Sequence, residues 1–359
     1  MKKYPLAIRY LIYIALVSAI IAVLSITKKL LVPLAISIFL TYLLYPAAHR
    51  LEKVGIPRII TNVLVIGVFL GSVLTFLFFL IRLFEGITND LPQLSMQFAE
   101  NISVFQQKIE ELFRLDIQQQ NEIIKTAGLS GDYFTTLITE GKNLIITLAL
   151  IPVYTYLMLF YRDKFREFFS MVVKPENEKF LQIIIDKAAD IVPKYLKGLF
   201  VVCFVLFGLN TLGFYLIGVK YFLLFGVLAA IFNFIPYLGT LLGYGIVLFF
   251  VLGVQSPSVA SAVIVQFFIV QFLEHNILTP NITGSYVQIN PFVIIFSLIA
   301  GGLVWNLPGM FLVIPTLGML KIVFETINTT KPYAFLLGTT GTEKHSITIH
   351  ALRKKFGWE

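Results

Sequence analysis

GLFVVCFVLFGLNTLGFYLIGVKYFLLFGVLAAIFNFIPYLGTLLGYGIVLFFVLGV, residues 198–254, contains a single formal charge, Lys220. The run continues to Leu320, so that 123 residues carry only two formal charges, Lys220 and Glu274, and one histidine, His275. A charge exposed to lipid costs about 3 kcal/mol at the centre of a membrane helix. The segment is therefore predicted to lie in lipid, and the Glu274–His275 pair is the first place to look for function.

The composition of the whole chain supports the same class of protein. Apolar residues make up 57%, charged residues 13%, and the mean hydropathy is +0.85, outside the usual range of soluble domains. The apolar runs are continuous and about twenty residues long, the length of a membrane-spanning helix, whereas β-barrel strands alternate over about ten residues. We therefore predict an all-α, polytopic helical membrane protein in contact with the lipid bilayer.

Counting apolar runs places about eight spans, some of them broken or re-entrant. They lie at roughly 10–27, 30–48, 59–82, 142–161, 199–219, 221–254, 257–279 and 290–324. The sixth and eighth runs are too long for a simple crossing, and Pro236 and Pro315 interrupt them. Either these helices are broken and tilted, or each folds into a re-entrant hairpin. Residues 235–241 and 314–320 match at five of seven positions, which favours either an internal repeat or a chance match of common residue types.

Lysine and arginine residues indicate the orientation in the membrane. Four basic segments lie at residues 2–9, 50–58, 162–197 and 331–355. With eight spans all four fall on one side, which the positive-inside bias makes cytoplasmic. The 85–142 segment falls on the other side, with nine acidic against four basic residues. Although Lys28 and Lys29 oppose this orientation, we predict a bacterial inner-membrane protein with both termini in the cytoplasm.

These patterns divide the chain into five regions. Residues 1–83 form an N-terminal region of three spans, and residues 84–141 form an extracytoplasmic helical insertion with a heptad seam. A fourth span and a cytoplasmic amphipathic helix occupy 142–198. A charge-poor transport core with broken helices occupies 199–325, and a basic cytoplasmic tail occupies 326–359.

The outer insertion carries an apolar seam with helical spacing. Asp90 is placed to cap the start of its helix, and Pro92 falls in the first turn, where a missing N–H is harmless. The seam residues recur every three or four positions and are Leu91, Leu94, Phe98, Ile102, Phe105, Ile109 and Leu112. The seam packs either against a neighbouring subunit or partner, or against the return segment 118–140 of the same chain.

A second amphipathic stretch, residues 176–197, is predicted to be cytoplasmic. Its apolar face contains Phe180, Ile184, Ala188, Ile191 and Tyr195, and lysines lie around it. Such a helix lies at the membrane surface or packs on the bundle as a plain connector.

Several functional classes are disfavoured by the sequence. It contains no His-Glu-x-x-His, no Gly-x-Ser-x-Gly and no Gly-x-x-x-x-Gly-Lys motif, so an enzyme or an ATP-driven pump is not expected. Cys203 is the only cysteine and the four histidines are scattered, so no metal or other cofactor is predicted. The net charge of +8 comes from membrane-edge residues and does not indicate nucleic acid as a partner.

Helix-breaking residues gather inside the apolar runs. Proline removes a backbone donor, and glycine lets helices approach closely. In a membrane, freed backbone groups persist only inside protein or beside a wet cavity, and transporters build sites from such broken helices. We assign helix-breaking or gating roles, with plain packing as the alternative for each, to Pro236, Gly239, Gly243, Pro280, Gly284, Pro291, Gly301, Gly302, Gly309 and Pro315.

Glu274 is the leading candidate for function. A carboxylate near a span is costly unless it is neutral, paired or wet, although one at the end of the span could simply face water. His275 is either its partner or an interfacial residue. We predict a transport and coupling site made of Glu274, His275, Asn276, Gln271 and Asn233.

Over residues 5 to 330 the chain resembles the autoinducer-2 exporter family of permeases. The resemblance rests on Asn233-Phe-Ile-Pro-Tyr-Leu-Gly239 and on Gln271-Phe-Leu-Glu-His-Asn-Ile-Leu-Thr-Pro280. Further matches are Pro57-Arg58, Ile282-Thr-Gly284, Ile289-Asn-Pro291, Gly301-Gly302, Gly309-Met310 and Ile314-Pro315. The combination is specific to the family, although no single part is.

The chain also departs from the family pattern. Asn290-Pro291 stands where the family often has His-Pro, so a proton-carrying role of that histidine does not transfer to position 290. His275-Asn276 and Trp305-Asn-Leu-Pro308 differ as well. The resemblance implies about eight spans, a homo-oligomer and transport without ATP, with links to autoinducer-2 export and, in some branches, to sodium–proton exchange.

From these patterns and the resemblance we predict a secondary-active exporter of a small solute such as autoinducer-2. A proton or cation on Glu274 would make the occluded state less costly, and substrate export would be coupled to that cycle. Two alternatives stay open. One is a monovalent cation–proton antiporter, and the other is a passive channel or a non-transporting scaffold built around the 91–112 helix.

Overall fold

The computed structural model describes residues 6–113, 116, 118–119, 122, 149–236, 238–282 and 288–339, and within these ranges the secondary structure is helical, with no strand. The principal helices are α1 (Leu6–Ile26), α2 (Lys28–Lys53), α3 (Arg58–Phe113), Ala149–Phe160, α6 (Arg162–Val172), α7 (Glu178–Ile217), α8 (Phe222–Phe232), α9 (Leu238–Val254), α10 (Pro257–Leu273), α11 (Thr279–Ile282), α12 (Pro291–Thr326) and α13 (Lys331–Leu337).

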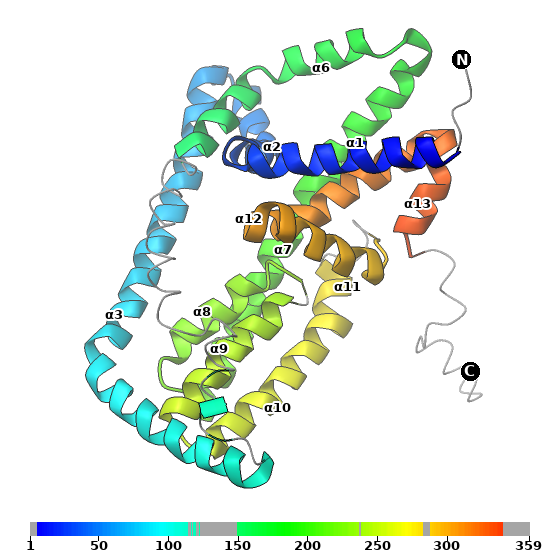
Figure 1. Cartoon of the computed structure of the whole chain (residues 1–359). Helices are drawn as coiled ribbons and strands as arrows, with labels where there is room; N and C mark the ends of the chain where they lie inside the picture. Colours follow the sequence, from blue (N-terminus) through cyan, green and yellow to red (C-terminus); the bar gives the residue numbers. More distant parts are fainter. Residues whose placement is uncertain are drawn as a thin grey trace, which may run out of the picture. The chain divides into compact units, whose positions relative to one another are not determined.

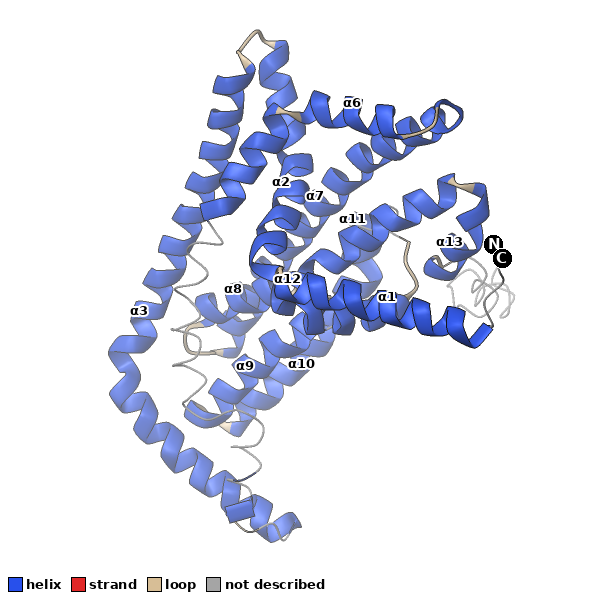
Figure 2. Cartoon of the chain, turned by 45° about the horizontal axis from the view of Figure 1, so that its top comes forward, coloured by secondary structure: helices blue, strands red, loops and turns tan. Residues whose placement is uncertain are grey.

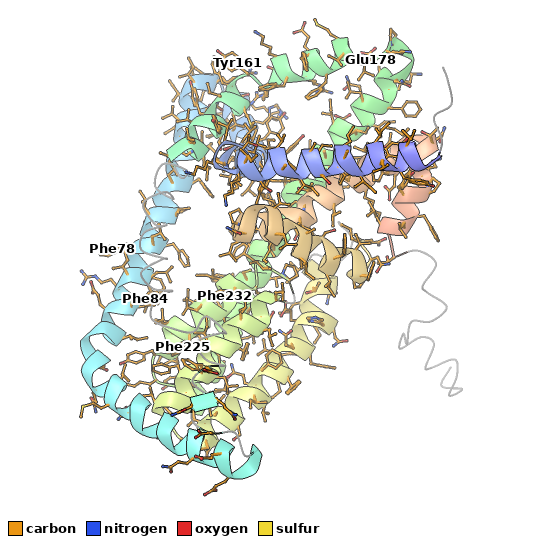
Figure 3. All side chains as sticks on the ribbon, viewed as in Figure 1. Phe78, Phe84, Tyr161, Glu178, Phe225 and Phe232 are labelled. Carbon is orange, nitrogen blue, oxygen red and sulfur yellow. The ribbon has the colours of Figure 1, made fainter. Side chains whose placement is uncertain are left out.

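Among the described residues, five helical stretches have the length and composition of a membrane-spanning helix, which confirms the predicted class. They are Lys28–Lys53, Arg58–Ile87, Glu178–Ile217, Pro257–Leu278 and Pro291–Thr326. Large apolar side chains also cover outer surfaces, as in a lipid-facing helix. Phe78 on α3 is 60% exposed, whereas Phe225 on α8 is 3% exposed and belongs to the core (Figure 3).

The chain forms two compact units. The first contains residues 1–28, 163–195 and 284–359, and the second contains residues 29–162 and 196–283. Helix α7 begins in the first unit and ends in the second. The stretch 176–197, which we expected to be a separate amphipathic helix, is instead mostly the first half of this 40-residue helix, preceded by one 3-10 turn, Pro175–Asn177.

In the second unit the long apolar run 221–254 is a helical hairpin. Helices α8 and α9 lie side by side (Figure 1), and the rings of Phe225 and Phe250 have centroids 4.7 Å apart. The two ends of the hairpin are joined by Gln255, whose Oε1 accepts from the Lys220 backbone N–H at 3.1 Å and whose Nε2 donates to the Gly218 carbonyl at 3.0 Å. Of the two interpretations left open by the sequence, the hairpin is correct here.

In the first unit α12 is also a hairpin. Its backbone leaves the helical region at Trp305 and at Asn306, which has φ 54° and ψ −140°. A Cβ on Gly309 would lie 2.0 Å from the Gly301 carbonyl oxygen, although residues eight apart in a straight helix are about 12 Å apart. The chain therefore folds back on itself. Helix α1 lies against this hairpin, where Trp305 Nε1 donates to the Leu24 carbonyl at 3.0 Å (Figure 2).

The two similar heptapeptides do not form a structural repeat. Pro236 lies in the turn between two helices, whereas Pro315 lies inside the second half of α12, beyond its reversal. Because the two prolines occupy different backbone conformations, the similarity of the sequences is a match of common residue types.

Helix α3 runs without interruption from Arg58 to Phe113, so the prediction that Asp90 caps a new helix is wrong. The Asp90 carboxylate instead forms an ion pair with Lys220 Nζ at 3.1 Å and accepts a hydrogen bond from the Tyr221 hydroxyl. Farther along, Asn101 Nδ2 donates to the Gly253 carbonyl at 2.9 Å. This part of α3 therefore packs on the α8–α9 hairpin of its own chain. Leu94 of the seam is buried, and most of the return segment 118–140 lies outside the described residues.

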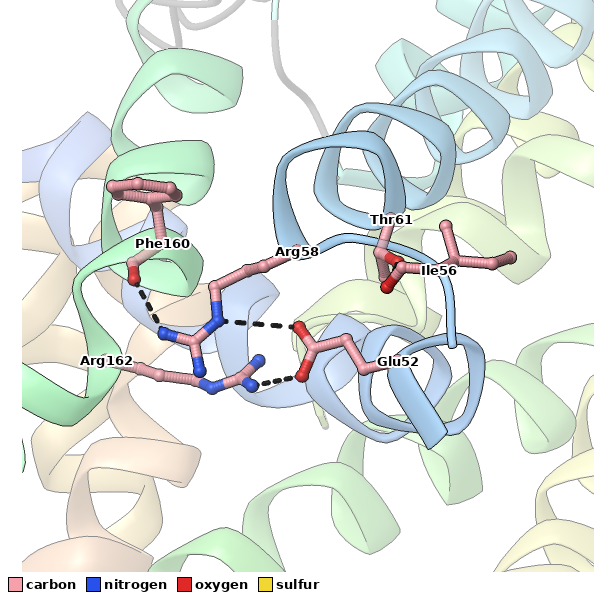
Figure 4. A network of polar contacts seen from close by, with 6 residues as sticks. All are labelled: Glu52, Ile56, Arg58, Thr61, Phe160 and Arg162. Atoms are coloured by element: carbon pink, nitrogen blue, oxygen red, sulfur yellow. Dashed lines mark hydrogen bonds and ion pairs between the residues drawn. The ribbon is translucent and has the colours of Figure 1, made fainter. Parts of the chain in front are cut away.

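A charged cluster joins three helix ends within the second unit (Figure 4). Glu52, at the end of α2, is paired with Arg162 and lies 3.7 Å from Arg58 Nε at the start of α3. Arg58 Nη1 also donates to the Phe160 carbonyl at 3.2 Å. The cluster holds the ends of α2, α3 and Ala149–Phe160 together.

The hairpin fold of 221–254 predicts that its two ends lie on the same side of the membrane. Alkaline phosphatase fused after Val219 or after Gln255 should give equal activity, and fusion to a fluorescent protein should give equal fluorescence. A reference fusion after Arg166, on the far side of the fifth span, should behave oppositely. Opposite signals at Val219 and Gln255 would mean a single crossing.

The contact between α3 and the loop before α8 should depend on pH. A hydrogen bond from Tyr221, with Lys220 nearby, lowers the pKa of Asp90, and the bond to Asp90 raises the pKa of Lys220. A carboxyl group whose pKa is lowered in the folded protein contributes stability at pH values above its ordinary pKa. This contribution is lost as the pH falls through the lowered pKa. Asp90→Asn should therefore lower the melting temperature slightly at pH 7, and the difference from wild type should shrink in acid. Glu85→Gln, on the same helix, is the control.

Candidate functional site

Glu274 is the only buried residue among the Asp, Glu, Lys, Arg and His residues whose burial is described, with 7% of its surface exposed. It lies at the end of α10, within the second unit and near the turn between α8 and α9. The alternative that Glu274 simply faces water is therefore wrong. A carboxylate in this position requires hydrogen-bond donors, because an unpaired buried charge is strongly destabilising.

Each carboxylate oxygen of Glu274 accepts a hydrogen bond from a side-chain amide. Asn233 Nδ2 donates to Oε1 at 2.8 Å, and Gln271 Nε2 donates to Oε2 at 2.9 Å. The Thr240 hydroxyl in turn donates to Asn233 Oδ1 at 2.7 Å. An ionised carboxylate only accepts hydrogen bonds, so the Asn233 amide must donate to Glu274 and accept from Thr240.

Asn233 reaches Glu274 because α8 ends immediately before it. The Phe234 and Ile235 backbone N–H groups close the last turn of α8 on Ile231 and Phe232, and Gly239 then donates to the Ile235 carbonyl at 2.8 Å. The turn is very tight, since a Cβ on Gly239 would lie 1.7 Å from the Phe232 carbonyl oxygen. Only glycine fits there, so Gly239 sets the turn that carries Asn233.

Glu274 opens a π-helical turn, Glu274–Leu278, between α10 and α11. The Thr279 backbone N–H bonds to the Glu274 carbonyl five residues back. Pro280 follows and has no N–H to continue the regular ladder, which gives a reason for the wider turn. Such turns are frequent at functional sites. Gln271 and Glu274 are three residues apart on the helix, so their side chains meet on one face.

The structure brings together three of the five predicted site residues. Glu274, Gln271 and Asn233 are in contact, whereas His275 and Asn276 are exposed on the same turn. Asn276 Nδ2 donates to the Phe272 carbonyl of its own helix at 2.9 Å. Thr240 belongs to the network but was missed, because its only sequence signal was a hydroxyl in the apolar run after Pro236.

The predicted helix-breaking residues fall in both units. In the second unit, Pro236 lies in the turn after α8, and a Cβ on Gly243 would lie 2.9 Å from the Ala229 Cα. Pro280 lies in α11, and Gly284 is outside the described residues. In the first unit, Pro291 opens α12, and the remaining residues belong to its hairpin: Gly301, Gly302, Gly309 and Pro315.

Chemically, the site holds one ionisable group between neutral donors. The amides of Asn233 and Gln271 stabilise an ionised carboxylate without cancelling its charge. A proton on Oε1 would turn that oxygen into a donor. The Asn233 amide could then reverse, because the Thr240 hydroxyl both donates and accepts. The network can therefore keep its hydrogen bonds in either form of the carboxyl group.

Comparison with known proteins shows that the chain as a whole is similar to membrane transport proteins. The family model of AI-2E family transporters matches residues 11–329. YrrI of Bacillus subtilis (strain 168), provisionally named a transport protein, is 27% identical over 316 residues, covering 82% of this chain and 86% of YrrI. PerM of Escherichia coli (strain K12), provisionally named a permease, is 27% identical over 82% of this chain and 87% of PerM. The AI-2 transport protein TqsA of the same strain is 22% identical over 94% of this chain and 97% of TqsA.

Gly239→Ala should disrupt the turn that carries Asn233. The added methyl group meets a backbone carbonyl, so we expect a loss of stability of about 1–3 kcal/mol. Gly245→Ala is the matched control on α9, because nothing lies within 4 Å of its Cβ position, and alanine there should stabilise the helix by about 0.5–1 kcal/mol. Thermal unfolding of both purified variants checks this; equal melting temperatures would contradict the proposed close approach.

Proposed function

Because the chain belongs to the AI-2E family of transporters, whose match spans most of its membrane helices, we propose that it is a secondary-active carrier that exports a small polar solute. The observation that supports this most directly is the buried Glu274 carboxylate, held by Asn233 and Gln271. A membrane transport role follows from the family itself. The direction, the energy source and the substrate are parts of the proposal.

In the proposed cycle, Glu274 binds a proton or a monovalent cation when its site opens to one side. The bound cation neutralises the carboxylate, which lowers the cost of closing an apolar bundle around it. Substrate then moves outward as the cation is released on the other side. Gln271 and Asn233 hold the carboxylate in place in both forms, and the Thr240 hydroxyl allows the Asn233 amide to reverse.

Autoinducer-2 is the proposed substrate, on the basis of resemblance alone. TqsA is named an AI-2 transport protein and aligns with nearly the whole chain. The described site contributes amide, hydroxyl and carboxyl groups, which suit a small polar solute.

A monovalent cation–proton antiporter is the second candidate. The same observation supports it, because a carboxylate between two neutral amides suits a cargo cation as well as a coupling cation. The passive channel and the scaffold have less support, since the α3 helix that would recruit a partner packs on the α8–α9 hairpin.

For location, we propose a bacterial inner membrane with both termini in the cytoplasm. Folding two long runs as hairpins removes two crossings from the eight predicted ones. Because the number of crossings stays even, both ends of the chain remain on the same side of the membrane. The basic tail therefore lies on the same side as the basic N-terminus. The homo-oligomer that the resemblance implies also remains a proposal.

Glu274→Gln should abolish cation-dependent proton movement. The glutamine keeps the size of the side chain but cannot bind or release a proton near neutral pH. Purified protein in liposomes with an internal pH dye would be exposed to sodium, potassium or lithium pulses. We expect at least a tenfold lower rate in the variant than in the wild type.

The control is Glu85→Gln, which removes an exposed carboxylate on α3 and should leave the rate unchanged. A cation-dependent signal without organic solute, lost in Glu274→Gln, would favour the antiporter. No signal from any cation would direct the search to export of organic solutes. Intact coupled transport in Glu274→Gln would exclude the proposed mechanism.

A further inference from the structure

A second polar cluster lies inside the same bundle, away from Glu274. It consists of Asn210 on α7, Tyr244 on α9 and Gln266 on α10, and each residue is at most 7% exposed. The Tyr244 hydroxyl donates to Asn210 Oδ1 at 2.5 Å, and Gln266 Nε2 donates to the Asn210 main-chain carbonyl at 3.2 Å. The cluster thus joins three helices that also contribute to the core around Phe214 and Val247.

One polar atom of this cluster lacks a hydrogen-bond partner. Gln266 Oε1 is buried and has no hydrogen-bond partner among the described residues. Leaving a buried acceptor without a donor costs about 1–3 kcal/mol. An amide that served only to join helices would be expected to use both of its ends. The free acceptor therefore indicates a group that binds something with an O–H or N–H to donate.

The Gln266 amide is also held in one place. A Cβ on Gly213 of α7 would lie 2.2 Å from Gln266 Nε2 and 3.1 Å from Oε1. The amide therefore fills the space that the missing side chain of Gly213 leaves. An exposed glutamine side chain can rotate toward different hydrogen-bond partners. The Gln266 side chain is instead held in position by the backbone of a neighbouring helix.

The second cluster is aligned with the Glu274 site. Gln266 and Glu274 are eight residues apart on α10, with buried Val270 between them, so all three lie on one helix face about 12 Å long. Thr240 and Tyr244, one from each cluster, are four residues apart on α9. Val270, which lies between Gln266 and Glu274 along the helix, packs against Val202 and Leu206 of α7.

We propose that Asn210, Tyr244 and Gln266 form a second binding station on the transport path, which accepts an O–H donor through Gln266 Oε1. This rests on the proposed transport role of Glu274. The donor is either water carrying a proton or a hydroxyl group of the cargo. The Val202–Leu206–Val270 cluster acts as the barrier between the two stations, and a species that passes from one to the other must separate these side chains.

The test compares Gln266→Leu and Tyr244→Phe with the wild type in liposomes. Leucine is similar in size and removes the unpaired acceptor, while phenylalanine removes only the hydroxyl that holds Asn210. One arm measures proton movement with an internal pH dye and no organic solute. The other arm measures efflux of labelled erythritol and ribitol as hydroxyl-bearing probes. Thermal unfolding is measured for every variant.

We expect Gln266→Leu to unfold at or above the wild-type temperature and Tyr244→Phe to unfold below it, because Asn210 Oδ1 then lacks its donor. Both variants should lose at least tenfold in rate. Loss in the proton arm identifies a proton-carrying water, and loss only in the efflux arm identifies a cargo hydroxyl. Wild-type rates in both arms would overturn the inference and leave a purely structural cluster. If Gln266→Leu does not fold, Tyr244→Phe decides alone by the same criteria.

Glu274→Gln in the same assay separates the two proposals. If Glu274→Gln loses transport while Tyr244→Phe and Gln266→Leu keep it, only the second station is wrong. If Glu274→Gln keeps wild-type transport, the proposed function of the first site fails. Absence of any flux by the wild type in both arms would overturn both.

Discussion

The hydrogen bond from Asn233 to Glu274 joins the turn of the α8–α9 hairpin to the end of α10. A carboxylate cannot stay inside an apolar bundle without donors, and donors must come from elements that end or break nearby. Several features of the second unit follow from this requirement. Helix α8 stops at Phe232, Gly239 permits a tight turn, and α10 widens into a π turn at Glu274.

Glycine determines how closely the helices around this site approach. Gly243 brings α9 against Ala229 of α8, and Gly213 leaves room for the Gln266 amide. In lipid, where association gains little from the hydrophobic effect, such contacts supply much of the attraction between helices. These glycines therefore serve packing in the second unit. A gating role for Gly239 and Gly243 stays a prediction.

Charged groups outside the spans connect the remaining parts of the second unit. Asp90 pairs with Lys220 between α3 and the hairpin, and Glu52 with Arg58 and Arg162 joins three helix ends. The Asp90 and Lys220 side chains are 41% and 42% exposed, so this pair costs less desolvation than one within the membrane. Glu274 differs from them, because its donors are neutral amides and its charge is not cancelled by those bonds.

The sequence by itself determined the helical membrane class and made Glu274 the leading candidate for the site, because hydropathy and the cost of a buried charge depend on residue type and local length. It could not choose between a broken crossing and a hairpin for 221–254, since proline and glycine permit both. It misplaced a helix start at Asp90, because the ion pair with Lys220 depends on a residue 130 positions away. The contact of Asn233 with Glu274 and the unpaired acceptor of Gln266 were decided only by tertiary structure. Both depend on which faces of α7, α9 and α10 meet, and periodicity within one helix does not specify the neighbour it faces.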